Sequence, residues 1–260
     1  MATYKKRGYK PKKEKISQEV EENFDETQST TAEVFNTLDD TANKSEEWIE
    51  KNSKPLFFGL VAVAVLILGY LAFTKFISEP NELKATNELA HPRTFFDQAE
   101  KSAGVAADSL YNLGLNGGDG KYGFIDVAGE FSGTNAGNIA NYYAGISYLK
   151  MKKYEKAIDY LSNFSSDDEL LGPTALGAIG DAFADINQPK DALEYYQKAA
   201  NKKDNEFTAP LFLFKAAQTA MEIKDYSTAE KLFTSIKQKY ATTDQGRDIE
   251  KYINSAKYAQ

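Results

Sequence analysis

One apolar stretch, Leu56–Phe73 (LFFGLVAVAVLILGYLAF), holds 18 residues without a charge or a strongly polar group. As an α-helix it would be about 27 Å long, close to the thickness of the hydrocarbon core of a bilayer. Pro55 suits the first turn of such a helix, and Lys75 can extend its ammonium group to the interface at the far end. We therefore predict one transmembrane helix over residues 55–77. The anchor residues expected to contact lipid are Leu56, Phe57, Phe58, Gly59, Leu66, Ile67, Gly69, Tyr70 and Phe73.

Two other interpretations of this stretch fit less well. A signal peptide has its apolar run near the N-terminus and is followed by a small-residue cleavage site. Here the run begins after 55 residues, and the following FTKFISEP offers no good cleavage site. A buried core helix carries one apolar stripe, whereas this segment is apolar all round.

The charged residues bear on topology and on partners. Ten lysines and arginines precede the apolar stretch, which by the positive-inside rule favours a cytoplasmic N-terminus and a periplasmic C-terminal domain. The reversed topology, with cytosolic repeats, is the alternative. A net charge of −7 argues against nucleic acid as the main partner, because phosphate binding requires a basic face. With no cysteine, the chain has neither disulfides nor a zinc–thiolate site.

The region before the apolar stretch divides in two. We expect residues 1–30 to be a disordered, charged cytoplasmic tail, either simply solvated or in contact with anionic lipid or RNA. Residues 31–54 carry apolar residues at helical spacing, including Leu38 and Trp48. They predict an amphipathic juxtamembrane helix on the inner membrane surface, or alternatively a helix that binds a partner.

Residues 78–137 are expected to form a linker, helices and a glycine-rich loop. The linker is predicted over 78–92 because it contains Pro80 and Pro92. In the helical part that follows, Ala106, Leu110 and Leu113 are predicted to share one apolar face. The glycine-rich NGGDGKYGF lacks the oxygen pattern of an EF-hand and the Gly-Lys-Ser/Thr of a phosphate loop, so we predict a connecting loop there.

Three segments after residue 138 share one pattern. Each opens on a small residue, Gly145, Gly180 or Ala217, has an alanine twelve positions later, and has a large residue four positions after that. The spacings of 35 and 37 residues are close to the 34-residue period of tetratricopeptide repeats. Residues 138–260 are therefore predicted to hold repeats at about 138–171, 173–206 and 210–243, followed by a capping helix.

This pattern predicts the packing of the whole domain. The small residues let the first helix (helix A) and the second helix (helix B) of each pair approach closely, and the large residues fill the space toward the next pair. Turns between helices A and B are predicted at Lys152–Lys153, Gln188–Pro189 and Lys224–Asp225. The fold class is all-α: a single transmembrane helix followed by a tetratricopeptide-repeat α-solenoid.

The sequence offers little support for catalysis or metal binding. Its one histidine, His91, lies in the predicted linker and has no second histidine or cysteine to share a transition metal. Asp181 and Asp185 lie one helical turn apart, which suits an acid–base pair of a hydrolase, but on a repeat helix such a pair also marks a polar surface. We expect no catalytic residue, no metal, no cofactor and no small-molecule substrate.

Binding to another protein remains as the expected activity. In repeats of this kind helix A lines the concave surface, which can take an extended peptide or a helix of a partner; alternatively, its residues face only solvent or another part of the chain. Counting from the small residues places eight side chains there: Tyr142, Ile146, Lys150, Asp181, Asp185, Phe214, Gln218 and Met221.

The order of parts resembles that of YfgM-type proteins, which are ancillary subunits of the bacterial Sec translocon. The stretch from Asn116 to Leu161 is similar to forms in Bacteroidota, including Gly118–Asp119–Gly120, Ala136–Gly137–Asn138 and Tyr142–Tyr143–Ala144–Gly145. The longer charged tail and the glycine-rich insertion depart from the best-known members. The resemblance implies an inner-membrane protein with a periplasmic repeat domain. Its implied partners are the SecYEG translocon and a PpiD-like membrane-anchored chaperone, in a network that hands over exported proteins. The alternative is a general cell-envelope scaffold not associated with Sec.

Overall fold

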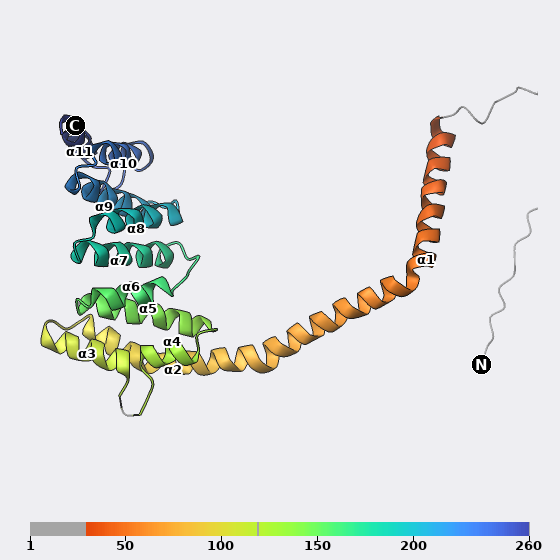
Figure 1. Ribbon diagram of the computed structural model, residues 1–260, viewed down its shortest axis with the longest axis horizontal. Coiled ribbons are helices and arrows are strands. Elements are labelled where there is room, and N and C mark those ends of the chain that lie inside the picture. Colours follow the sequence, from red (N-terminus) through yellow and green to blue (C-terminus); the bar gives the residue numbers. More distant parts are fainter. Residues whose placement is uncertain (1–29, 119, 260) are drawn as a thin grey trace, which may run out of the picture. The chain divides into compact units, whose positions relative to one another are not determined.

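The computed structural model describes residues 30–118 and 120–259, and within those residues every regular element is a helix (Figure 1). This confirms the predicted all-α fold class. The chain divides into two compact units, Met1–Leu68 and Gly69–Gln260. The predicted tail over residues 1–30 lies outside the described residues, apart from its last residue.

The first long element is α1 (Thr30–Phe73), a single helix that includes Pro55. The sequence predicted two helices here, over 31–54 and 55–77, and the structure joins them. A proline inside a helix removes one backbone hydrogen bond and crowds the preceding turn, yet α1 runs through Pro55 without ending. Trp48 is 59% exposed, and Leu38 is exposed as well. Whether this face lies on a membrane stays a prediction.

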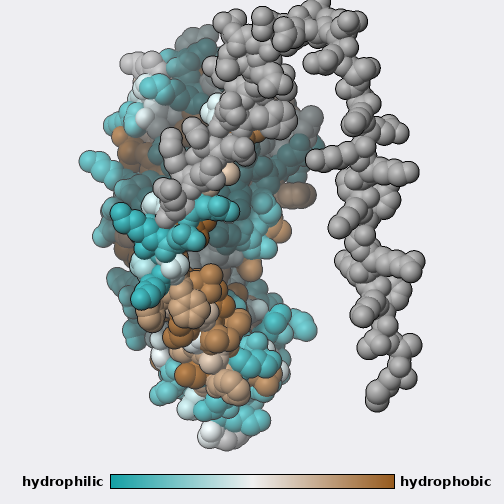
Figure 2. All heavy atoms as spheres, turned by 90° about the vertical axis from the view of Figure 1, so that its right-hand side faces the viewer, coloured by the Kyte–Doolittle hydropathy of each residue, from teal (hydrophilic) through white to brown (hydrophobic). Residues whose placement is uncertain are grey.

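Among residues 30–118 and 120–259, one helix is long and apolar enough to cross a membrane, and none of its 18-residue apolar window is buried within the structure. Burial of a large aliphatic or aromatic side chain stabilises a protein by roughly 1.5–3 kcal/mol, so a run of uncovered ones is not stable in water. In Figure 2, apolar side chains gather in one group, while hydrophilic side chains dominate the rest of that face.

The apolar helix leads directly into the second unit. A π-helical turn, η1 (Thr74–Ser78), is followed without a break by α2 (Glu79–Ala99). The predicted linker over 78–92 is therefore wrong. Pro80 lies in the first turn of α2, directly after the π-helical turn η1, and a local π-helical turn is one way in which a continuous helix accommodates a proline. Pro92 sits inside the helix and is buried, so its contacts with the core offset the hydrogen bond that it removes.

Three further elements complete the start of the solenoid, by which we mean α2 to α11: α3 (Val105–Asn116), α4 (Phe124–Glu130) and α5 (Asn135–Lys150). Phe96 of α2 lies at the centre of their shared core. Its ring centroid is 5.7 Å from that of Tyr111, 6.3 Å from that of Phe124 and 4.9 Å from that of Tyr143. Helix α2 is thus a packed member of the solenoid.

The buried face of α3 is displaced by one residue from the face predicted from the sequence. Ala107 and Tyr111 are buried, whereas Ala106 and Leu113 are exposed and Leu110 is half-buried. The apolar residues of this helix extend over both faces, and Phe96 selects the face that carries the Tyr111 ring.

The remaining helices form pairs and a final cap. In chain order they are α6 (Tyr154–Ser162), α7 (Leu171–Asp185), α8 (Pro189–Lys202), α9 (Thr208–Glu222), α10 (Tyr226–Lys239) and α11 (Ile249–Tyr258). Helices α5, α7 and α9 are the A helices, and α6, α8 and α10 are their B partners.

The small residues that open each repeat lie where helices A and B touch. A Cβ atom added to Gly145 would come within 2.5 Å of Leu161, and one added to Gly180 within 2.6 Å of Tyr196. Leu161 and Tyr196 are the large residues sixteen positions further on. The predicted close approach of helices A and B is therefore present in the first two pairs, while the third pair has Ala217 at this position.

The turns between helices A and B share one backbone design. Lys152, Asn187 and Lys224 all have φ near +60°. The amide after each donates to a carbonyl five residues back, at 2.8, 2.9 and 2.8 Å. This is a Schellman cap, which uses a left-handed residue to stop a helix. All three caps fall within one residue of the turns predicted from the sequence.

The last helix, α11, covers the end of the stack. Ile249, Ile253 and Ala256 are buried, and the ring of Tyr252 stacks on Phe233 of α10 with centroids 5.4 Å apart. These four residues form the apolar side of α11, as expected for a capping helix.

Replacing Gly180 by alanine is expected to destabilise the solenoid by about 1–3 kcal/mol, because overpacking forces a neighbour to move. The Tyr196 ring cannot easily move away, since its hydroxyl donates to Asp181 at 2.6 Å. The measurement is the thermal unfolding midpoint of the full chain in detergent, followed by circular dichroism.

Gly129→Ala in α4 is the matched control, because a Cβ atom at Gly129 meets nothing within 4 Å. Its midpoint should be unchanged or higher, because alanine favours a helix by about 0.5–1 kcal/mol over glycine. Equal midpoints for the two variants would contradict the proposed close contact.

Candidate protein-binding surface

All eight side chains predicted for the binding surface lie on A helices. Three are on α5, two on α7 and three on α9. None is fully buried, yet only Lys150, Asp185 and Gln218 are exposed. The other five are half-buried and make contacts within the chain, which limits what they can offer to a partner.

On α5, the two apolar members contribute to the core. The Tyr142 ring lies 5.2 Å from that of Phe164, and burial raises the pKa of its hydroxyl. Ile146 packs against the cluster that contains Leu161. Lys150, at the end of the helix, forms an ion pair of 3.2 Å with Glu100.

On α7, Asp181 joins three helices. Its carboxylate accepts from Lys215 Nζ of α9 at 2.6 and 2.9 Å and from the Tyr196 hydroxyl of α8 at 2.6 Å. Burial, and then this carboxylate, raise the pKa of Tyr196. Asp181 is therefore a structural acceptor between repeats, engaged by donors from α8 and α9.

On α9, the apolar members also face inward. The Phe214 ring lies 4.9 Å from Tyr252 of the capping helix and 5.7 Å from Phe233 of α10. Met221 packs against the same cluster. Phe214 reaches the edge of a hollow of about 330 Å³ beside the start of α11, so part of its ring remains accessible.

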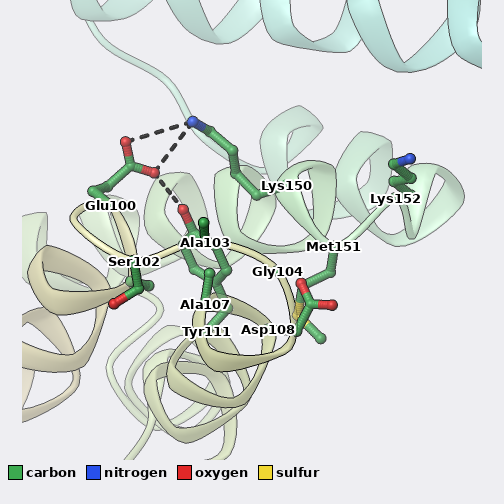
Figure 3. Close-up of a pocket in the computed structure, with 11 residues that line it drawn as sticks. Glu100, Ser102, Ala103, Gly104, Ala107, Asp108, Tyr111, Lys150, Met151 and Lys152 are labelled. Atoms are coloured by element: carbon green, nitrogen blue, oxygen red, sulfur yellow. Dashed lines mark hydrogen bonds and ion pairs between the residues drawn. The ribbon is translucent and has the colours of Figure 1, made fainter.

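A larger hollow of about 540 Å³ lies where α2, α3 and α5 end or begin (Figure 3). The Glu100 carboxylate lies between the Lys150 ammonium group and the Tyr111 hydroxyl, which donates to it. The hydrogen bond from Tyr111 and the charge of Lys150 lower the pKa of Glu100 despite partial burial. Asp108 and Met151 lie on the other side of the hollow.

This hollow offers both signs of charge to a polar segment. Lys150 and Lys152 supply ammonium groups, and Asp108 supplies a carboxylate across the hollow from Glu100. Of its charged residues only Lys150 was predicted from the sequence. Glu100 lies 50 residues from Lys150 in the chain, and no local spacing signals that they meet.

The other candidates have structural roles or no partners. His91 is half-buried inside α2 and packs edge-on against Phe95 at 5.1 Å, whereas the sequence placed it in an exposed linker. Asp126 accepts from the Gly123 amide at 2.9 Å and so caps α4. Over residues 30–118 and 120–259, no group of three or more acidic, histidine or cysteine side chains could hold a metal ion.

Comparison with known families identifies the first helix pair. A model of the tetratricopeptide repeat matches residues 140–167, which include most of α5 and all of α6. No curated protein matches the chain. The chain therefore contains a tetratricopeptide repeat, a fold that binds other proteins and is not catalytic by itself.

Replacing Asp181 by alanine should lower the unfolding free energy by about 1–2 kcal/mol, because it removes the hydrogen-bond acceptor of both Lys215 and Tyr196. Partial exposure of the pair keeps the effect at this level. Asp185→Ala, one turn along the same helix, removes an interaction with the Tyr154 side chain at the surface, and it should change the unfolding free energy by less than about 0.5 kcal/mol. Denaturant unfolding of the full chain in detergent measures both, and equal effects would contradict the assigned role of Asp181.

Proposed function

We propose that the chain is a single-pass inner-membrane protein with a cytoplasmic N-terminus and a periplasmic solenoid. Two observations support this. The apolar window of the candidate span has no protein cover, and ten basic residues precede it against a net charge of −7 for the chain. A span with uncovered apolar side chains on all sides is stable in hydrocarbon, and the basic side of such a span stays in the cytoplasm.

The solenoid acts in this proposal as a non-catalytic interaction module. The observation that carries the proposal is the tetratricopeptide match over residues 140–167, supported by two further helix pairs with the same turns. The acidic residue that best suited a catalytic role, Asp181, is engaged by Lys215 and Tyr196. Binding is then carried by the accessible groups on the A helices, which are Lys150, Asp185, Gln218 and part of Phe214.

The proposed partners are the SecYEG translocon and a PpiD-like membrane-anchored chaperone. In this proposal the solenoid passes exported proteins to these partners or receives exported proteins from them. This part of the proposal rests on the resemblance to YfgM-type proteins. An anchored module with a polar binding face suits such a role, because both partners lie in the same membrane and the two-dimensional confinement raises their effective concentration.

A photo-crosslinking amino acid placed at Gln218 tests the proposal in intact membranes. The matched control is Lys231, which is exposed on α10 of the same pair. We expect position 218 to capture a PpiD-like chaperone or a Sec subunit, and position 231 to capture neither. Capture of cell-wall or outer-membrane assembly proteins from position 218 would favour the scaffold alternative. Equal capture from both positions would contradict a binding face on the A helices.

A further inference from the structure

We propose that the edge of the solenoid next to the anchor rests on the lipid surface, with Leu170 and Phe207 inserted into the bilayer interface. By the anchor-side edge we mean the loops that precede the A helices, residues 131–134, 163–170 and 203–207. The inference depends on the membrane crossing proposed above but on none of the proposed partners.

The start of the solenoid follows closely on the end of the predicted span. Gly69–Ser78 belongs to the same compact unit as the solenoid, and its helix continues into α2. The Glu82 carboxylate accepts from the amides of Asn135 and Ala136 at 2.7 and 3.0 Å. Ile77 is the last residue of the predicted span, and Glu82 follows it by five positions, about 7.5 Å along a helix. A headgroup layer is about 5–8 Å thick. The start of α5 therefore lies at the outer boundary of the headgroups.

Hydrogen bonds connect the start of α5 to the loops before α7 and α9. Asn138, in the first turn of α5, exchanges hydrogen bonds of 2.7 and 3.0 Å with the backbone of Ser165. The Asn205 side chain donates to the Glu169 carbonyl at 2.9 Å. These contacts join the three loops into one continuous edge, at which α2, α5, α7 and α9 all begin (Figure 1).

Two apolar side chains, those of Leu170 and Phe207, are exposed on this edge. Leu170 and Phe207 occupy the N-cap positions of α7 and α9, where polar residues are preferred. The capping is performed two residues earlier: Asp168 accepts from the Leu170 amide at 2.8 Å, and Asn205 from the Phe207 amide at 2.9 Å. The side chains of Leu170 and Phe207 therefore do not cap these helices, and they are 49% and 77% exposed.

Exposure of a phenylalanine and a leucine at matching positions of successive repeats suits the membrane interface, where aromatic and aliphatic side chains are favoured. In the first pair the N-cap is Thr134, which is polar and buried, and Glu82 of α2 accepts hydrogen bonds from the two amides that follow it. Apolar N-caps thus appear in the two pairs that the anchor does not hold directly.

Two of the five acidic side chains on the edge are paired with lysines. Asp167 pairs with Lys202 at 3.3 Å, and Glu169 pairs with Lys203 at 3.8 Å. This pairing weakens the repulsion between the acidic loops and lipid phosphates, and it places two ammonium groups near the headgroups. Asp168, Asp204 and Glu206 on the same loops are not matched by a lysine or arginine, so the edge stays negative and its contact with lipid depends on the apolar side chains.

Single tryptophans test the contact directly. In a Trp48→Phe background, Phe207→Trp and Val105→Trp are made in the full chain and reconstituted into vesicles of phosphatidylethanolamine and phosphatidylglycerol. Part of the lipid carries bromine atoms on its acyl chains near the headgroups. Val105 is the matched control, because it is 83% exposed and lies beside the hollow at the far end of α2. Circular dichroism checks that both variants keep their helical content.

We expect bromine to quench the tryptophan at 207 at least about twofold more strongly than the one at 105, with a blue-shifted emission at 207 only. Leu170→Trp should behave like the variant at 207. Equal quenching at 207 and 105, in a chain that floats with the vesicles, would overturn the lipid contact but leave the membrane crossing intact. Equal quenching at the two positions is also the result expected if Phe207 is covered in the cell by a partner protein and not by lipid. A chain that fails to float would overturn both.

Discussion

The contact between Glu82 and the first turn of α5 holds the start of α2 against the rest of the solenoid. A carboxylate near the start of α2 binds two amides that a helix N-terminus otherwise leaves without partners. The partial positive charge of that helix end strengthens the bond. Because α2 follows the apolar helix without a linker, this contact lies only five residues after the end of the predicted span.

From α5 onward, each helix pair depends on the pair before it. Gly145 and Gly180 bring helices A and B together, and bridging groups such as Asp181 connect one pair to the next. No pair can bury its apolar surface alone, so stability is shared along the stack and a capping helix is needed at its end. Such a stack presents its accessible side chains on several helices, which suits contact with an extended surface of another protein.

Features that depend on local spacing could be predicted from the sequence. The repeats, the turns at Lys152 and Lys224, and the apolar side of α11 follow from residues a few positions apart. The linker was wrong because proline was taken as a sign of irregular structure. Pro80 in fact lies where a helix tolerates it, and Pro92 is held by burial in the core.

The predicted binding surface was harder to assign from the sequence, because residues distant in the chain contact several of its side chains. Phe214 meets Tyr252, and Asp181 meets Lys215, across 38 and 34 positions of the chain. A helical face read from one repeat cannot show which of its side chains the next repeat or the cap will cover. For the same reason Glu100 and its contact with Lys150 had no signal in the sequence.

The central claim is that anchor and solenoid are joined by packed helix, and amide hydrogen exchange of the full chain in lipid nanodiscs tests it most directly. The account predicts that amides of residues 82–91 exchange as slowly as those in the middle of α5. Exchange of residues 82–91 as fast as that of the loop at 241–247 would show a flexible connection and contradict the account.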